Sequence, residues 1–126
     1  MPRFVILVHE APWGRHWDLM LEKGPALATW AIPRPPDAAG TLLAEALPDH
    51  RLAYLDYEGP VSGGRGHVTR WDQGTYQVDQ ESETGLEVVL CGGKLAGRVR
   101  LCRCPGESRL WEYSFCAQDP RAEQLR

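Results

Sequence analysis

The sequence contains no apolar segment close to the length of a membrane-spanning helix. Such a helix needs about 20 predominantly apolar residues, and no run in the 126 residues approaches that length. The first ten residues, MPRFVILVHE, include one short apolar run but lack the longer hydrophobic region and small-residue cleavage site of a signal peptide. We therefore expect no membrane association and no secretory signal, and we expect a cytoplasmic protein.

Closely spaced cysteine pairs are also missing. The four cysteines are Cys91, Cys102, Cys104 and Cys116, and no C-x-x-C motif occurs among them. Structural zinc sites usually contain such pairs, so the spacing gives little support to a zinc site built from thiolates. Without an export signal, we expect reduced thiols, as is usual in the cytoplasm.

The chain has no excess of positive charge. Its formal net charge is -3 and its pI is near 5.8, which excludes a strongly basic nucleic-acid-coating protein. A local basic surface is still compatible with this charge, because KLAGRVRLCR (94–103) contains no acid. If the chain binds nucleic acid, we expect Lys94, Arg98 and Arg100 to contact the backbone, and on a strand Arg98 and Arg100 share one face. The alternative is an ordinary solvated strand face.

Short strand-like segments separated by turn residues make up most of the sequence. The 13 Gly and 10 Pro favour turns over long helices, and 43% hydrophobic with 25% charged residues is typical of a globular protein with a core. Residues 41–47 fit either a strand or a short helix. Strands are predicted over residues 4–8, 17–22, 26–32, 52–59, 67–71, 75–78, 86–90, 98–102 and 110–115.

These segments predict an all-β fold. Residues 17–22 and 26–32 flank KGP (23–25) and are expected to form a hairpin, whereas WDQGTY (71–76) indicates a strand–turn–strand unit with Gly74 in the turn. So many strands in a short chain favour a closed barrel or a sandwich. We expect a compact antiparallel β-barrel of about eight short strands with little helix. We expect residues 1–126 to form one domain, with residues 119–126 as a flexible tail.

The segment HEAPWGRHWDLMLE (9–22) concentrates two histidines and an aspartate. His16 and Asp18 are two residues apart, so on a strand they point to the same face with Cα atoms roughly 6.5–7 Å apart. His9 ends the first predicted strand, and residues 11–15 can loop back to bring His16 beside it. Two imidazoles and one carboxylate leave coordination positions open for substrate or water, as a catalytic metal requires. The alternative is a solvated polar strand edge.

Six motifs then follow one another in an order typical of a known family. They are FVILVHE, GRHWDLMLE, ATWAIPR, PDHRLAYLDYEG, HVTRWDQGTY and GGKLAGRVRLCR. Over about residues 4–113 the chain resembles the 3'-phosphoesterase domain of bacterial DNA ligase D. The resemblance implies a compact β-barrel with an active site on a crescent-shaped surface. It also implies removal of terminal ribonucleosides and 3'-phosphates from DNA or RNA–DNA primers, with a divalent metal.

The resemblance assigns the metal ligands to His9, His16 and Asp18, although the loop between the histidines is one residue longer here. It implies Mn²⁺ as the metal, and the nitrogen and oxygen donors are also compatible with Zn²⁺ or Co²⁺.

Four further residues match positions of the family's active site. His50 matches a histidine that contacts phosphate or assists the chemistry, and Tyr54 matches a tyrosine of the same site. Arg34 stands where the family has a lysine, so the positive charge is kept. Glu22 matches a glutamate that follows the metal-binding strand.

The most serious departures from the family are at four further positions. Met20 and Leu42 replace two arginines, the first of which contacts phosphate, while Pro48 replaces an acid and Leu7 a glutamine. Methionine cannot supply the bidentate fork by which arginine binds phosphate. Loss of such a contact in the transition state can cost on the order of 3 kcal/mol or more.

Other cationic side chains are candidates for the missing phosphate contacts. Arg15 adjoins His16, Arg51 follows His50, and Arg65 lies with His67 around a glycine-rich loop. Backbone N–H groups of such a loop can also bind an anion. We hypothesise that Arg65 and its loop partly restore phosphate binding; the alternative is a flexible hairpin loop.

Together these observations predict a metal-dependent phosphoesterase that acts on nucleic-acid 3' ends in DNA repair. One alternative is a catalytically impaired module that binds metal and nucleic-acid ends, and another is a phosphodiesterase with a different small substrate. We expect a monomer without a ligase or polymerase region of its own, and a DNA repair ligase or polymerase as its partner.

Overall fold

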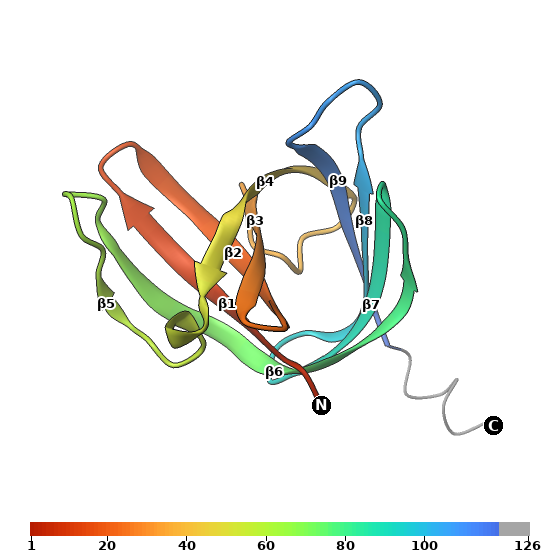
Figure 1. The fold of residues 1–126 in the computed structure, drawn as a ribbon, viewed down its shortest axis with the longest axis horizontal. Helices are drawn as coiled ribbons and strands as arrows, with labels where there is room; N and C mark the ends of the chain where they lie inside the picture. The colour runs from red at the N-terminus through yellow and green to blue at the C-terminus, as the bar shows by residue number, and fades with distance from the viewer. Residues whose placement is uncertain (119–126) are drawn as a thin grey trace.

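The computed structural model describes residues 1–118, in which nine strands pair into a single antiparallel sheet (Figure 1). The residues predicted to form a flexible tail, 119–126, lie outside the described residues. The strands are β1 Arg3–Ala11, β2 Gly14–Lys23, β3 Ala26–Ile32, β4 Thr41–Arg51, β5 Gly59–Pro60, β6 His67–Glu81, β7 Gly85–Gly92, β8 Ala96–Arg103 and β9 Leu110–Ala117, with a 3₁₀ turn, η1, at Leu52–Leu55.

The sheet closes on itself. Its strand order is β1-β2-β3-β4-β9-β8-β7-β6-β5, and β1 also pairs with β6. Eight strands therefore form a ring. The two-residue β5 is not part of the ring but pairs with the first residues of β6 (Figure 1). This closure confirms the predicted antiparallel barrel and rules out the sandwich. It also satisfies the strand edges, which an open sheet would leave unpaired.

Two apolar clusters lie on opposite faces of the barrel wall. The main core fills the interior with side chains from all eight ring strands, such as Phe4, Ile6 and Leu101. The second core packs Val5, Leu7, Met20, Leu27, Leu55 and Val68 between η1 and the outer face of β1, β2, β3 and β6. Strand β1 contributes to both clusters, which explains why its sequence is continuously apolar rather than alternating.

Residues 52–59 correct one prediction, because only Gly59, the first residue of β5, lies in a strand. Leu52–Leu55 form η1, whose Leu55 is buried in the second core while Leu52 and Tyr54 pack beside it. An alternating pattern of apolar residues is therefore compatible with a strand and also with a short 3₁₀ turn that covers an apolar surface. The ambiguous segment 41–47 is part of a strand, β4, which continues to Arg51.

Gly74 corrects a second prediction. It is not in a turn, since β6 runs without interruption from His67 to Glu81 and pairs with β1 and then β7. Gly74 lies opposite both Phe4 and Gly92, and a Cβ atom there would overlap the Cys91 carbonyl oxygen. Glycine at this position lets the backbones approach closely where β6 pairs with both β1 and β7.

A buried carboxylate fixes the turn between β7 and β8. Asp72 accepts hydrogen bonds of 2.8–3.0 Å from the backbone N–H groups of Gln73, Gly93, Lys94 and Leu95. These bonds compensate for burying the charge and tie the turn to β6.

The remaining predicted strands lie within β1, β2, β3, β7, β8 and β9, and the predicted hairpin joins β2 to β3. All four cysteines are free of disulfides. Within residues 1–118, no helix is long and apolar enough to cross a membrane.

Candidate metal centre and phosphate pocket

The β1–β2 hairpin brings the two histidines of the first motif together. His9 and His16 are direct partners across the antiparallel pair, and Pro12 and Trp13 form the connecting turn. Partners across such a pair project from the same face, and the two rings lie edge to face with centroids 4.7 Å apart. Asp18 shares this face, as its spacing from His16 predicted.

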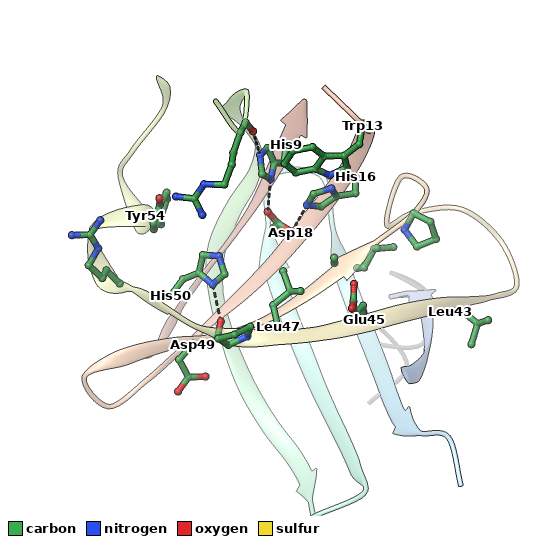
Figure 2. A pocket seen from close by; sticks show the side chains of 16 residues that line it. His9, Trp13, His16, Asp18, Leu43, Glu45, Leu47, Asp49, His50 and Tyr54 are labelled. Carbon is green, nitrogen blue, oxygen red and sulfur yellow. Dashed lines mark hydrogen bonds and ion pairs between the residues drawn. The ribbon is translucent and has the colours of Figure 1, made fainter. Parts of the chain in front are cut away.

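The three side chains converge on one point. His16 Nε2 lies 2.9 Å from Asp18 Oδ1, and His9 Nδ1 lies 3.6 Å from Asp18 Oδ2 (Figure 2). One ligand atom from each residue lies within 4.8 Å of the others. We call these three residues the metal-ligand cluster. Only 3% of Asp18 is exposed, whereas the histidines are partly exposed, so the cluster opens to solvent through the imidazoles.

The protonation of His16 depends on its neighbours. Direct contact with the Asp18 carboxylate raises the pKa of His16, burial of the ring opposes this effect, and the charges of Asp18 and Glu45 add to it. The Asp18 carboxylate therefore favours the protonated form of the His16 imidazole.

His9 is oriented by the loop that follows β5. Its Nε2 lies 2.7 Å from the Arg65 carbonyl oxygen, and a carbonyl only accepts, so Nε2 donates. In a neutral ring this leaves the Nδ1 lone pair facing Asp18.

The oxygens of Asp18 are poorly satisfied by protein groups alone. Among the residues that the structure describes, the buried Oδ1 has only the ion-pair contact with His16 Nε2 at 2.9 Å, and Oδ2 faces the His9 Nδ1 lone pair. Opposed acceptors repel unless a proton or cation lies between them. The donor set therefore fits a divalent ion such as Mn²⁺, Zn²⁺ or Co²⁺.

The metal-ligand cluster forms part of the lining of an open pocket of about 770 Å³. Its walls come from β1 to β4, the residues after β4, and the loop between β5 and β6. The lining comprises His9, Trp13, His16, Asp18, Ala31, Ile32, Pro33, Leu43, Glu45, Leu47, Pro48, Asp49, His50, Arg51, Tyr54 and Arg65. This volume is within the range of roughly 300–1,000 Å³ typical of small-molecule sites.

His50 and Tyr54 enter the pocket from the end of β4 and from η1. Their rings lie edge to face with centroids 5.7 Å apart. His50 Nδ1 is 2.9 Å from the Pro48 carbonyl oxygen, so Nδ1 donates and Nε2 remains available to a ligand. Figure 2 shows both residues on one side of Asp18, with Glu45 and Leu43 on the other.

Two of the predicted replacement cations, Arg51 and Arg65, line the same pocket. Arg65 donates to the carbonyl and hydroxyl oxygens of Ser62 at 2.7 and 3.2 Å, which holds its guanidinium group within its own loop. Within residues 1–118, neither arginine forms an ion pair with a carboxylate. Their charge is thus available to an anion.

Four other predicted residues lie outside the pocket lining. Arg15 pairs with Glu10 at 2.8 Å, and Glu22 accepts a hydrogen bond from the Arg3 backbone N–H at 2.8 Å. Arg34 and His67 are exposed.

The predicted basic track on β8 is partly neutralised by neighbouring strands. Arg98 and Arg100 share the outer face, as expected, but Arg98 pairs with Asp79 and both arginines approach Glu87. Lys94 lies 4.6 Å above the Trp71 ring. None of these three cations lines the pocket.

The positions where the family's arginines are missing have become apolar packing sites. Met20 is 1% exposed within the second core, and Leu42 packs against the main core. Neither side chain lines the pocket, so the two substitutions are accommodated by the fold.

Sequence reasoning missed the residues that form the other side of the pocket. Trp13 lies in the hairpin turn, while Leu43, Glu45 and Leu47 project from alternate positions of β4. Their period of two would have indicated a shared face if residues 41–47 had been assigned to a strand.

Comparisons with known proteins identify a family to which the chain is similar. Residues 8–103 match the model of the family described as the DNA Ligase D 3'-phosphoesterase domain. The multifunctional non-homologous end joining DNA repair protein LigD of Mycobacterium tuberculosis is 36% identical over 113 residues, covering 82% of this chain and 15% of that protein. The LigD protein of Pseudomonas aeruginosa is 34% identical over 135 residues, covering 98% of this chain and 16% of that protein. The chain therefore spans about one sixth of the length of these relatives.

Proposed function

The chain belongs to the DNA ligase D 3'-phosphoesterase domain family, and on this premise we propose that it is a metal-dependent phosphoesterase acting on the 3' ends of DNA or RNA–DNA primers. One observation carries the proposal: a pocket that combines His9, His16 and Asp18 with two arginines not paired with acids. A metal-ligand cluster beside free cations is suited to a phosphate ester, which is anionic and needs charge stabilisation.

The metal would be held by His9, His16 and Asp18, with Mn²⁺ as our first choice. When bound, such an ion polarises a phosphate oxygen and stabilises the charge that develops there. The Arg65 carbonyl supports this role by holding His9 with Nδ1 toward Asp18. Partners of this kind orient metal ligands and increase their basicity.

The phosphate would be bound by Arg51 and Arg65. Both guanidinium groups line the pocket without a carboxylate partner among residues 1–118, and guanidinium forms strong charge-assisted bonds to phosphate. They would take over the role of the family's arginine at position 20.

His50, when protonated on both ring nitrogens, would donate the Nε2 proton to the leaving oxygen. Its Nδ1 is engaged by Pro48, so Nε2 is the nitrogen that can act in the pocket. Tyr54 packs against the His50 ring and would steady it or donate to the phosphate. Arg34 and Glu22 lie outside the pocket lining, and we give them no direct role in this mechanism.

The biological setting follows from the relatives, which are named as multifunctional non-homologous end joining proteins. We propose that this domain processes 3' ends in the same repair process. A DNA repair ligase or polymerase would then use the trimmed end.

A second candidate function is a module that binds nucleic-acid ends without cutting them. The burial of Met20 and the packing of Leu42 favour it, because those positions offer no phosphate contact. Arg51 and Arg65 would then retain the end but fail to stabilise the transition state.

The phosphoesterase and the end-binding module differ in whether they cut the 3' end, and one experiment measures this. Metal-stripped protein is incubated with Mn²⁺ and a labelled primer–template ending in a 3'-phosphate or a single ribonucleotide, beside the variants His16→Ala and Gln80→Ala. Gln80 is an exposed residue of β6 outside the pocket. We expect trimming by the native protein and by Gln80→Ala. The loss in His16→Ala should be at least the 10- to 100-fold typical of removing an outer partner of a metal ligand.

Metal binding without trimming would favour the end-binding module. Trimming of small phosphodiesters but not of primer ends would indicate a different substrate. If Mn²⁺, Zn²⁺ and Co²⁺ all fail to bind, the metal-dependent proposal is wrong.

A further inference from the structure

Trp13 is the most exposed large aromatic residue that lines the pocket. It is 69% exposed, and Leu43 in the same lining is 58% exposed. Neither residue belongs to the main core or the second core. Packing in the two cores therefore does not account for Trp13. Large apolar side chains gathered on a concave surface usually mark a binding site, so we look to the pocket for the role of Trp13.

The pocket is chemically divided. Its lining includes the cationic and polar side chains of His50, Arg51, Tyr54 and Arg65 and the apolar side chains of Leu43 and Leu47. Figure 2 shows His50 and Tyr54 on one side of Asp18 and Leu43 on the other. The metal-ligand cluster lies between the two sides in this view. We call Leu43 and Leu47 the apolar wall, and Trp13 lines the same pocket from the turn between β1 and β2.

The apolar wall is unsuited to phosphate. It carries no cation, and the exposed Glu45 carboxylate lies among its β4 residues. An anion is therefore directed to Arg51 and Arg65. A ligand that fills both sides must carry a phosphate joined to an uncharged, flat or apolar group.

We propose that Trp13 stacks on the base of the 3'-terminal nucleotide whose phosphate is bound on the arginine side, in the pocket that Leu43 and Leu47 also line. The inference rests on the proposed function and adds a substrate preference to it. An indole ring offers a flat face to every base, so the interaction tolerates any sequence. A base that stacks on Trp13 must leave its own duplex stack, so the site prefers frayed or single-stranded 3' ends.

The test is equilibrium binding by fluorescence anisotropy, with EDTA present so that no trimming occurs. The ligands are single-stranded oligonucleotides with a 3'-phosphate, whose last nucleotide either carries a base or is abasic. A third oligonucleotide carries the base and a 3'-hydroxyl. The proteins are the native chain, Trp13→Ala, Trp13→Phe and, as a control at an exposed apolar residue outside the pocket, Val78→Ala.

We expect the native protein and Val78→Ala to bind the end with a base about 5- to 100-fold more tightly than the abasic end, as for one base stacked on an aromatic side chain. Trp13→Ala should lose this preference while keeping its affinity for the abasic end, and Trp13→Phe should retain most of it. Circular dichroism checks that each variant folds, which the exposure of Trp13 favours.

The stacking proposal is overturned if the native protein shows no preference for a base. It is also overturned if Trp13→Ala keeps the preference, or if it lowers the affinity for both oligonucleotides equally. The apolar wall would then bind another partner, such as a protein. Failure of the proposed function gives a different result. In that case the 3'-phosphate and 3'-hydroxyl ends bind equally, whether or not the preference for a base is present.

Discussion

At the scale of single residues, the capacity of the pocket to bind an anion depends on which arginines lack a carboxylate partner. Three arginines predicted to bind phosphate or nucleic acid are paired with acids: Arg15 with Glu10, Arg98 with Asp79 and Arg100 with Glu87. Arg65 instead has its guanidinium bound to Ser62 oxygens, which fix its position and leave its charge uncompensated. An arginine held in place this way loses less conformational freedom on binding phosphate.

Arg65→Gln tests this role. The variant keeps a polar side chain but removes the charge, so we expect affinity for a 3'-phosphorylated end to fall about 10- to 100-fold, the equivalent of one charge-assisted hydrogen bond. Binding at several salt concentrations should show a weaker salt dependence. Arg109→Gln is the matched control, because Arg109 is exposed and outside the pocket. Equal losses in both variants would mean that only overall charge matters.

At the scale of elements, the loop between β5 and β6 orients His9 of β1, which we propose as a metal ligand. The loop of residues 61–66 closes on itself through a hydrogen bond from the Val61 N–H to the Gly66 carbonyl. It also offers the Arg65 carbonyl to His9. Gly66 has a positive φ of 86°, and a Cβ atom there would overlap the Glu10 carbonyl oxygen. The glycine thus allows the loop to lie directly against β1.

Gly66→Ala should push the loop away from β1 and break the contact with His9. We expect affinity for Mn²⁺, measured by calorimetry, to fall about 10- to 100-fold, as for other outer partners of metal ligands. The control is Gly64→Ala, since Gly64 also has a positive φ, of 68°, but open space around its Cβ position. If both variants bind Mn²⁺ equally well, the loop does not orient His9.

The elements also show where local patterns mislead. Alternation at 52–59 predicted a strand, but the same apolar residues anchor η1 on the second core. Gly74 resembled a turn residue, but it serves close packing inside β6. In both cases a long-range contact decided the conformation, and no short window of sequence contains that contact.

At the scale of the whole molecule, closure of the barrel depends on β4 meeting β9, two strands far apart in the sequence. Tyr113 of β9 is buried in the main core, and its hydroxyl donates to the Pro36 carbonyl at 2.8 Å. This bond ties the loop that precedes β4 to the last strand.

Burial strongly raises the pKa of Tyr113, and the charge of Asp37 adds to the shift. A group whose pKa is higher in the folded state holds its proton more tightly there. Its contribution to stability is present below the ordinary tyrosine pKa, about 10, and is lost as the pH rises above it. Burial raises the pKa of Tyr76 as well, with the same sign.

We therefore expect the free energy of unfolding, measured with urea, to fall as the pH rises from 9 to 11, and to fall less steeply in Tyr113→Phe. At pH 8 the variant should be less stable by about 1 kcal/mol, the value of one hydrogen bond. Taking the difference between the two proteins cancels the titration of other groups. Identical slopes would show that Tyr113 does not contribute to alkaline unfolding.

The sequence by itself determined what depends on neighbouring residues. Spacing placed His16 and Asp18 on one strand face, the turn residues placed His9 beside them, and apolar periodicity indicated an all-β chain with most of its strands. Strand geometry fixes such relations within a few residues. The resemblance to the family also predicted that His50 and Tyr54 belong to the site.

Only the tertiary structure decided which distant segments share the pocket. Strand pairing brings Arg65 to His9 and places Trp13 and Leu43 in the same lining. It also pairs Arg98 and Arg100 with acids of neighbouring strands. These outcomes depend on strand order and register, which arise when the whole chain closes one barrel around one core, so no local pattern specifies them.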